Sequence, residues 1–152
     1  ILYYSLRSIK VQKERLKELE ALAEKENCKI VVITPFSAPF SSEKCFDYHY
    51  EFGPKEFLNA IAKSKKVVTD SYHGTILSIN LGKSVYSICS EIGSEFRKTD
   101  ILKNIGLGDR IIESIADINP CATQPTDTNV QKRIIDFREK SLNYLRNALT
   151  VE

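Results

Sequence analysis

The 152-residue sequence predicts an open, doubly wound α/β fold, in which helices cover both faces of a parallel sheet. Two observations support this class. Short apolar runs alternate with longer segments of helical periodicity, and each run is apolar at nearly every position. Such continuous runs are typical of parallel strands, because these strands are buried on both faces. The predicted strands lie near residues 1–5, 29–34, 66–70 and 84–88.

The first third of the chain contains two of these strands and the helix between them. Residues 1–5 are apolar and aromatic, and Ser8 follows them as a candidate helix cap. The helix is predicted to run to about Glu26, since apolar residues recur at helical spacing opposite a face rich in Lys and Glu. The β-branched run at 29–34 is the second strand.

Residues 35–53 are predicted to form a long loop, because they contain prolines, several serines and Gly53. Long loops inside compact domains are uncommon and often functional. This one carries aromatic and histidine side chains, namely Phe36, Phe40, Phe46, Tyr48, His49, Tyr50 and Phe52. The plainer interpretation is that these aromatic side chains pack on the core.

Helices and strands continue to alternate in the rest of the chain. A helix begins at Pro54 and precedes the strand at 66–70. The next helix, at 74–81, ends at Gly82 before the strand at 84–88. The later predicted elements are a helix at about 99–105, a short strand at 110–112, a linker or surface loop at 119–128 and a helix at 130–149. The apolar side of the last helix is marked by Ile134, Phe137, Leu142, Leu145 and Leu149.

Composition excludes several classes of function. The net charge is +2, which gives no electrostatic reason to expect nucleic acid or an anionic membrane as a partner. No apolar run approaches the roughly 18 residues of a membrane span, and no signal peptide is expected. The chain contains no Met, so we expect upstream sequence to exist. The four cysteines form no CxxC pair, which favours reduced thiols of a cytoplasmic protein over a zinc site or a disulfide framework.

The sharpest local pattern is the segment 67–75, where an apolar strand ends in polar residues and a helix begins. In a doubly wound fold, ligands bind at this edge of the sheet. Free amides at the helix N-terminus, Gly74, the Ser71 hydroxyl and the His73 imidazole together suit a phosphate or a carboxylate. A second interpretation stays open, in which Asp70 and Ser71 only cap the helix and His73 is a satisfied turn residue. Neither GxxxxGK[ST] nor GxGxxG is present, and we predict no cofactor and no metal site.

The stretch from Gly53 to Arg110 resembles the C-terminal part of the polysaccharide pyruvyl transferase family. The resemblance rests on motifs in the family's order, which are residues 54–58, 67–75, 81–85, Arg97, 100–102 and 106–110. Two positions depart from the family pattern. Ser84 stands where a proline is usual, and Lys98-Thr99 intervene between Arg97 and Asp100.

This resemblance implies that residues 1–152 form a single Rossmann-like domain, similar to one half of a B-type glycosyltransferase. The chain would be the C-terminal half of a two-domain enzyme, inactive without its N-terminal half. The family moves the pyruvyl group of phosphoenolpyruvate onto a sugar of a cell-surface or exopolysaccharide, which gives a ketal and phosphate. The expected partners are therefore phosphoenolpyruvate, a sugar or glycan acceptor and the N-terminal domain.

The resemblance also assigns roles. His73 is the expected catalytic residue, as a general acid or as an imidazolium that holds phosphate. The expected substrate-binding residues are Asp70, Ser71, Tyr72, Gly74, Thr75 and Arg97. Weaker candidates are Arg7 and Glu91, which follow strands, and His49, which could contact an acceptor sugar beside Tyr48 or Tyr50. Two rival functions stay open, a non-catalytic anion-binding module and a glycosyltransferase that uses a nucleotide-sugar.

Overall fold

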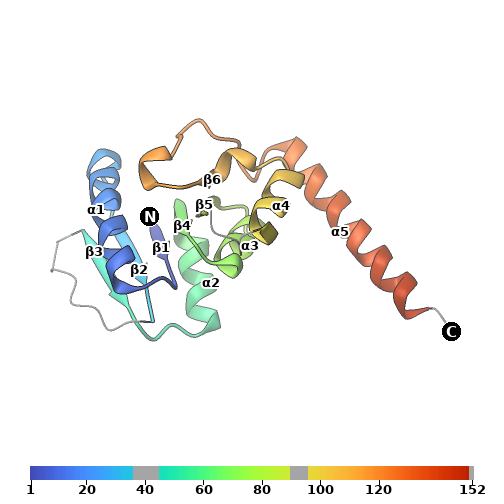
Figure 1. The fold of residues 1–152 in the computed structure, drawn as a ribbon, viewed down its shortest axis with the longest axis horizontal. Coiled ribbons are helices and arrows are strands. Elements are labelled where there is room, and N and C mark those ends of the chain that lie inside the picture. The colour runs from blue at the N-terminus through green and yellow to red at the C-terminus, as the bar shows by residue number, and fades with distance from the viewer. Residues whose placement is uncertain (36–44, 90–95, 151–152) are drawn as a thin grey trace.

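A parallel sheet forms the centre of the domain in the computed structural model, which describes residues 1–35, 45–89 and 96–150 (Figure 1). The strand order is β3-β2-β1-β4-β5-β6. The strands are β1 (Leu2–Tyr4), β2 (Ile30–Ile33), β3 (Phe46–His49), β4 (Lys66–Thr69), β5 (Ser84–Ile88) and β6 (Ile111–Ile112). Pairing is parallel throughout, so the sequence-based prediction of a parallel sheet is confirmed.

Helices cover both faces of this sheet. They are α1 (Ile9–Glu26), α2 (Pro54–Lys63), α3 (Tyr72–Asn80), α4 (Phe96–Asn104) and α5 (Thr128–Leu149), with short 3₁₀ turns η1 (Gly108–Arg110) and η2 (Ile115–Asp117). On one face, Tyr3 packs in a core with Leu19 of α1. On the other face, Leu2 shares a core with Ile61 of α2 and Leu102 of α4. Successive residues of β1 thus enter opposite cores, as the period of two in a strand requires.

The strand order creates one topological switch point. The chain leaves β1 for β2 on one side and leaves β4 for β5 on the other side, while β1 and β4 are neighbours. The connections therefore diverge above the carboxyl ends of β1 and β4, where open α/β sheets bind their ligands. The segment 67–75 ends at this edge.

The strand β3 lies inside the stretch predicted as a loop, and that prediction is wrong for residues 46–49. This strand pairs with β2, from Ile30↔Phe46 to Ile33↔His49. It is an edge strand whose side chains are only partly buried, so polar residues interrupt the apolar pattern. Phe46 and Tyr48 pack against one core and Phe52 against the other, which supports the plainer interpretation for these rings. Tyr50 is exposed, and Phe36 and Phe40 lie outside the described residues.

Three helices begin earlier than the sequence indicates. The helix α3 starts at Tyr72 because Ser71 is its N-cap, and the Ser71 hydroxyl accepts a hydrogen bond from the Gly74 amide at 3.3 Å. The helices α4 and α5 start at Phe96 and Thr128, two or three residues before the predicted positions. At the first helix Ser8 occupies the N-cap position, yet its side chain makes no capping bond.

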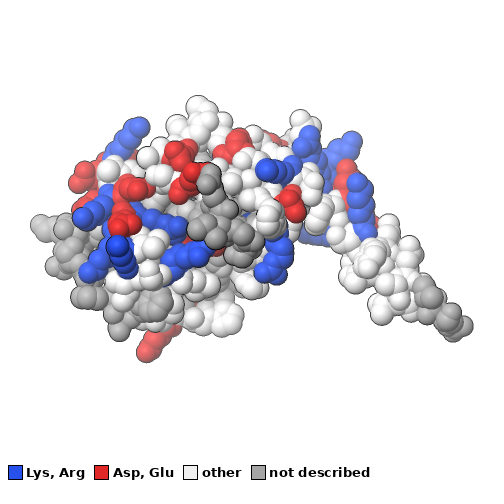
Figure 2. All heavy atoms as spheres, in the orientation of Figure 1, with Lys and Arg blue, Asp and Glu red and all other residues white. Residues whose placement is uncertain are grey.

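The helix α5 leaves the body of the domain (Figure 1). Its 22 residues measure about 33 Å at 1.5 Å per residue, and only Val130 is buried. Ile134 packs against the second core, whereas the other predicted apolar positions, Phe137, Leu142, Leu145 and Leu149, are exposed. On the face shown in Figure 2, Lys and Arg gather on the part of α5 nearest the body, and its far end is mostly uncharged. Among the described helices, none has the length and apolarity that a membrane crossing requires.

Candidate functional site

A hollow of about 380 Å³ lies at the switch point, at the carboxyl ends of β1, β4 and β5. Three segments build it: the turn after β1, the turn between β4 and α3, and the first turn of α4. The lining residues are Leu6, Arg7, Asp70, Ser71, Tyr72, His73, Arg97 and Lys98. The structure therefore brings most of the predicted site residues together, and the weaker candidate Arg7 lines the same hollow. Glu91 lies outside the described residues.

The first turn of α3 offers backbone donors to this hollow. The Ser71 amide is bonded to Thr69 Oγ1 at 3.0 Å, and the Gly74 amide is capped by the Ser71 hydroxyl. The amides of Tyr72 and His73 have no acceptor among the residues that the structure describes. Because the helix dipole adds about half a positive charge at this end, the two amides favour an anion.

Tyr72 contacts two of the side chains that line the hollow, Arg97 and His73. The Arg97 guanidinium is 5.3 Å from the centre of the Tyr72 ring, and the His73 ring meets Tyr72 edge-on at 5.6 Å. Both Arg97 and His73 are exposed. A cation over an aromatic face keeps its hydrogen-bonding capacity, so the Arg97 guanidinium can still bind an anion in the hollow, which the exposed His73 ring also lines.

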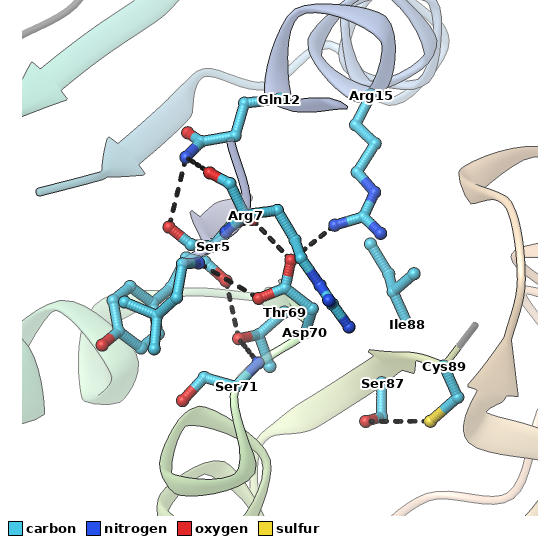
Figure 3. Close-up of polar contacts among 12 residues, drawn as sticks. Ser5, Arg7, Gln12, Arg15, Thr69, Asp70, Ser71, Ser87, Ile88 and Cys89 are labelled. Carbon is cyan, nitrogen blue, oxygen red and sulfur yellow. Dashed lines mark hydrogen bonds and ion pairs between the residues drawn. The ribbon is translucent and has the colours of Figure 1, made fainter. Parts of the chain in front are cut away.

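Asp70 lines the hollow, but its carboxylate is committed within the protein. The side chain is only 3% exposed and accepts hydrogen bonds from Ser5, the Leu6 amide and Arg15 (Figure 3). Asp70 therefore presents little of its carboxylate to a substrate.

Gly74 and Thr75 face the protein interior and do not line the hollow. A Cβ atom on Gly74 would stand 2.7 Å from Thr69 Oγ1 and 3.1 Å from Tyr4 Cδ1, so the glycine is required by the packing of α3 on the sheet. Thr75 is fully buried, and its hydroxyl donates to the Ser71 carbonyl at 2.9 Å and lies 3.1 Å from Ser87 Oγ. Both residues thus set the position of the helix N-terminus.

Sequence reasoning missed Lys98 and Arg15. Lys98 is 4% exposed, and its ammonium group donates to the carbonyls of Asp70 at 2.7 Å and Ile88 at 3.0 Å. No motif marks it, because a lysine near a helix start is ordinarily solvated. Arg15 did carry a signal, since it lies three residues after the buried Gln12 and four before the buried Leu19 on α1.

His49 lies elsewhere. It lines a larger hollow, of about 580 Å³, between α2 and strands β1 to β3. His49 Nε2 is 3.2 Å from Asp47 Oδ2, and its ring packs on Phe52. That hollow lies over one face of the sheet, and none of residues 70–75 lines it. We assign the candidate site to the smaller hollow, because it lies at the switch point and collects helix amides and cations.

Metal ligands do not gather in the described part of the chain, where no group of three or more His, Cys, Asp or Glu side chains is placed to hold an ion. None of the four cysteines, Cys28, Cys45, Cys89 and Cys121, forms a disulfide bond.

Fold and hollow together define a class, the doubly wound α/β domain with a candidate anion site at its switch point. Within this class, the chain belongs to the polysaccharide pyruvyl transferase family, whose family model matches residues 2–88, more than half of the chain. The resemblance noted in the sequence is thereby confirmed. None of the curated proteins matches the chain in sequence.

The fold is also similar to a solved glycosyltransferase structure, a mutant of the O-GlcNAc transferase of Thermobaculum terrenum. The TM-score is 0.55 at 12% sequence identity, over 76% of this chain. This likeness confirms the expected fold, a Rossmann-like unit that resembles one half of a B-type glycosyltransferase. The chain spans about a quarter of that protein, since it covers 26% of its length.

Proposed function

We propose that the protein transfers the pyruvyl group of phosphoenolpyruvate onto a sugar of a cell-surface or exopolysaccharide, and that the hollow at the switch point holds the anionic donor. One observation carries this proposal: the α3 amides, His73 and Arg97 converge on a single hollow. Phosphate and carboxylate groups are the natural ligands of such a set. Membership of a transferase family supports the class of reaction.

The proposed chemistry assigns a role to each group. Two sugar hydroxyl oxygens bond to C2 of phosphoenolpyruvate, the bond from C2 to the phosphate oxygen breaks, and the methylene carbon takes up a proton. One hydroxyl proton balances the new methyl group and the other leaves with phosphate. His73 is exposed at the hollow, where it can deliver a proton as general acid or hold the phosphate as imidazolium. The α3 amides and Arg97 stabilise the charge that grows on the leaving phosphate.

We further propose that a second α/β domain of the same protein supplies the acceptor site. Two substrates must be held in register, and positioning supplies much of the rate of such a reaction. The four cysteines form no disulfide bond, as in most cytoplasmic enzymes, and we propose that the reaction takes place in the cytoplasm.

Ligand-induced stabilisation of the full-length protein tests the class of donor. Phosphoenolpyruvate at about 100 times its Kd is expected to raise the free energy of unfolding by about 2.7 kcal/mol. A nucleotide-sugar at the same concentration is expected to raise it little. Thermal unfolding with each ligand measures the difference, and stabilisation by the nucleotide-sugar alone would favour a glycosyltransferase. Binding of phosphoenolpyruvate without turnover would favour a non-catalytic module.

Arg97→Met should weaken the binding of phosphoenolpyruvate by about tenfold or more, because a hydrogen bond to a charged group is worth about 1.5–3 kcal/mol. The methionine keeps an apolar stem beside Tyr72, so the rim retains its packing. Calorimetric titration of the purified full-length variant measures the affinity. An exposed arginine outside the hollow, Arg146, provides the control, since Arg146→Met should leave the affinity unchanged. Equal affinities of the Arg97 variant and the wild type would remove Arg97 from the site.

A further inference from the structure

We propose that Asp70 is a positioning residue, which joins the three segments of the hollow into one rigid unit. This inference rests on the proposed function only in taking the hollow as an anion site. Residues 70–73 form one wall, the turn after β1 forms a second, and the start of α4 forms the third. Asp70 is bonded to each of the other two, through its carboxylate on one side and its main-chain carbonyl on the other.

The carboxylate holds the turn after β1. Oδ2 accepts hydrogen bonds from Ser5 Oγ and Arg15 Nη1, each at 2.5 Å, and Oδ1 accepts one from the Leu6 amide at 3.1 Å. Figure 3 shows Ser5 and Arg15 approaching the carboxylate from the turn and from α1. A buried carboxylate needs such partners, because an unpaired charge in the interior is strongly unfavourable. The geometry of the turn is thereby tied to the negative charge of Asp70.

Neighbouring buried groups reinforce this side. The Gln12 amide nitrogen donates to the Arg7 carbonyl at 2.7 Å and fixes the backbone from which Arg7 reaches the hollow. The Tyr3 hydroxyl is buried close to Ser5 and Arg15. Burial raises the pKa of Tyr3, which therefore stays a neutral phenol. The negative charge that pairs with the Arg15 guanidinium is therefore the Asp70 carboxylate, and not a tyrosinate.

The carbonyl of Asp70 holds the start of α4. The Lys98 ammonium donates to this carbonyl and to that of Ile88, and so it joins the carboxyl ends of β4 and β5 to the helix that carries Arg97. Displacement of residue 70 therefore moves the α3 amides, the Arg7 turn and the Arg97 helix relative to one another. An error of about 1 Å in a binding geometry can cost about 100-fold in rate.

The chain contains a matched control for this contact. A second ion pair, Lys66–Glu26, also joins β4 to α1, but at the opposite edge of the sheet. Asp70→Asn and Glu26→Gln each convert a carboxylate into an amide and weaken one of the two ties. Only the first tie lies at the hollow, so only Asp70→Asn should alter anion binding.

Histidine NMR distinguishes positioning from a general structural role. The sequence has two histidines, of which His73 lies at the hollow and His49 lines the other one, so His49 serves as an internal reference. In the full-length protein, Asp70→Asn should shift the His73 Cε1–H signal and weaken the binding of inorganic phosphate at least tenfold. The His49 signal should stay in place, and Glu26→Gln should match the wild type in both measurements.

Two results would overturn the proposal. One is a folded Asp70→Asn protein with an unchanged His73 signal and unchanged phosphate affinity. The other is an equal loss in Glu26→Gln, which would indicate general loosening between α1 and β4. If Asp70→Asn does not fold, Ser5→Ala removes one donor and should shift the His73 signal in the same direction by less, while no shift contradicts the proposal. If the wild type binds no phosphate, the proposed function fails, whereas the His73 signal still decides the positioning role.

Discussion

Replacing His73 by alanine is expected to lower the turnover of the full-length enzyme by about 10²–10⁴-fold, the usual value of general acid–base catalysis. The same change should alter the free energy of unfolding by less than about 1 kcal/mol, because His73 is exposed and its ring meets that of Tyr72 edge-on. Phosphate release and the melting temperature, measured on one purified sample, give both quantities.

The outcome that contradicts this prediction is the reverse pattern. A fall of many degrees in melting temperature, with the rate per folded molecule preserved, would make His73 a structural residue. The control is His49→Ala, which removes the other histidine from a different hollow. That variant should keep its rate of phosphate release, unless the acceptor sugar reaches the edge strand β3.

Arg110→Met should lower the free energy of unfolding by about 3 kcal/mol, because it leaves buried acceptors without a donor. Arg110 is fully buried, and its guanidinium donates to the carbonyls of Thr123 and Ala122 and to the hydroxyl of Ser84 at 2.7–2.9 Å. The guanidinium also lies 4.5 Å from the centre of the Tyr86 ring. It thereby fastens the segment before α5 to the sheet. Urea denaturation of both proteins measures the loss.

Arg146→Met is the control for this stability measurement as well, since Arg146 is exposed on α5 and its replacement should cost no more than about 0.5 kcal/mol. If Arg110→Met were no less stable than this control, the hydrogen bonds of Arg110 would contribute nothing net to folding. Arg110 would then not fasten the segment before α5 to the sheet.

The parallel sheet could be predicted from the sequence because its central strands are buried on both faces and consist mostly of apolar or β-branched residues. Residues 66–70 and 84–88 show this pattern, and each segment is followed by residues at helical spacing. The edge strand β3 lacks the signal, since one side of it is open and Asp47 and His49 occupy that strand. The apolar residues of α5 recur at helical spacing, which predicts a buried side. Periodicity cannot show that the sheet and its helices contact only the first turns of α5, so that the later apolar residues are exposed.

The candidate site was predictable in its location and only partly in its roles. The change from strand to polar turn to helix predicted that His73 lies at the carboxyl ends of the strands, where the structure also has it. Chemical type did not separate the residues that face the hollow from those that build it, because Asp70 and Thr75 are as polar as a ligand-binding residue. Lys98 comes from the next strand–helix unit, so its proximity depends on long-range packing that no local motif encodes.

The most direct test of the proposed activity is a reaction of the full-length protein with phosphoenolpyruvate and a panel of saccharide acceptors. Phosphate release and the formation of a pyruvyl ketal on the acceptor are followed together by phosphorus NMR and mass spectrometry. The proposed activity predicts equimolar phosphate and ketal, both formed about 10²–10⁴-fold more slowly by His73→Ala. Transfer of a sugar from a nucleotide-sugar, with phosphoenolpyruvate left unconsumed in every reaction, would contradict it.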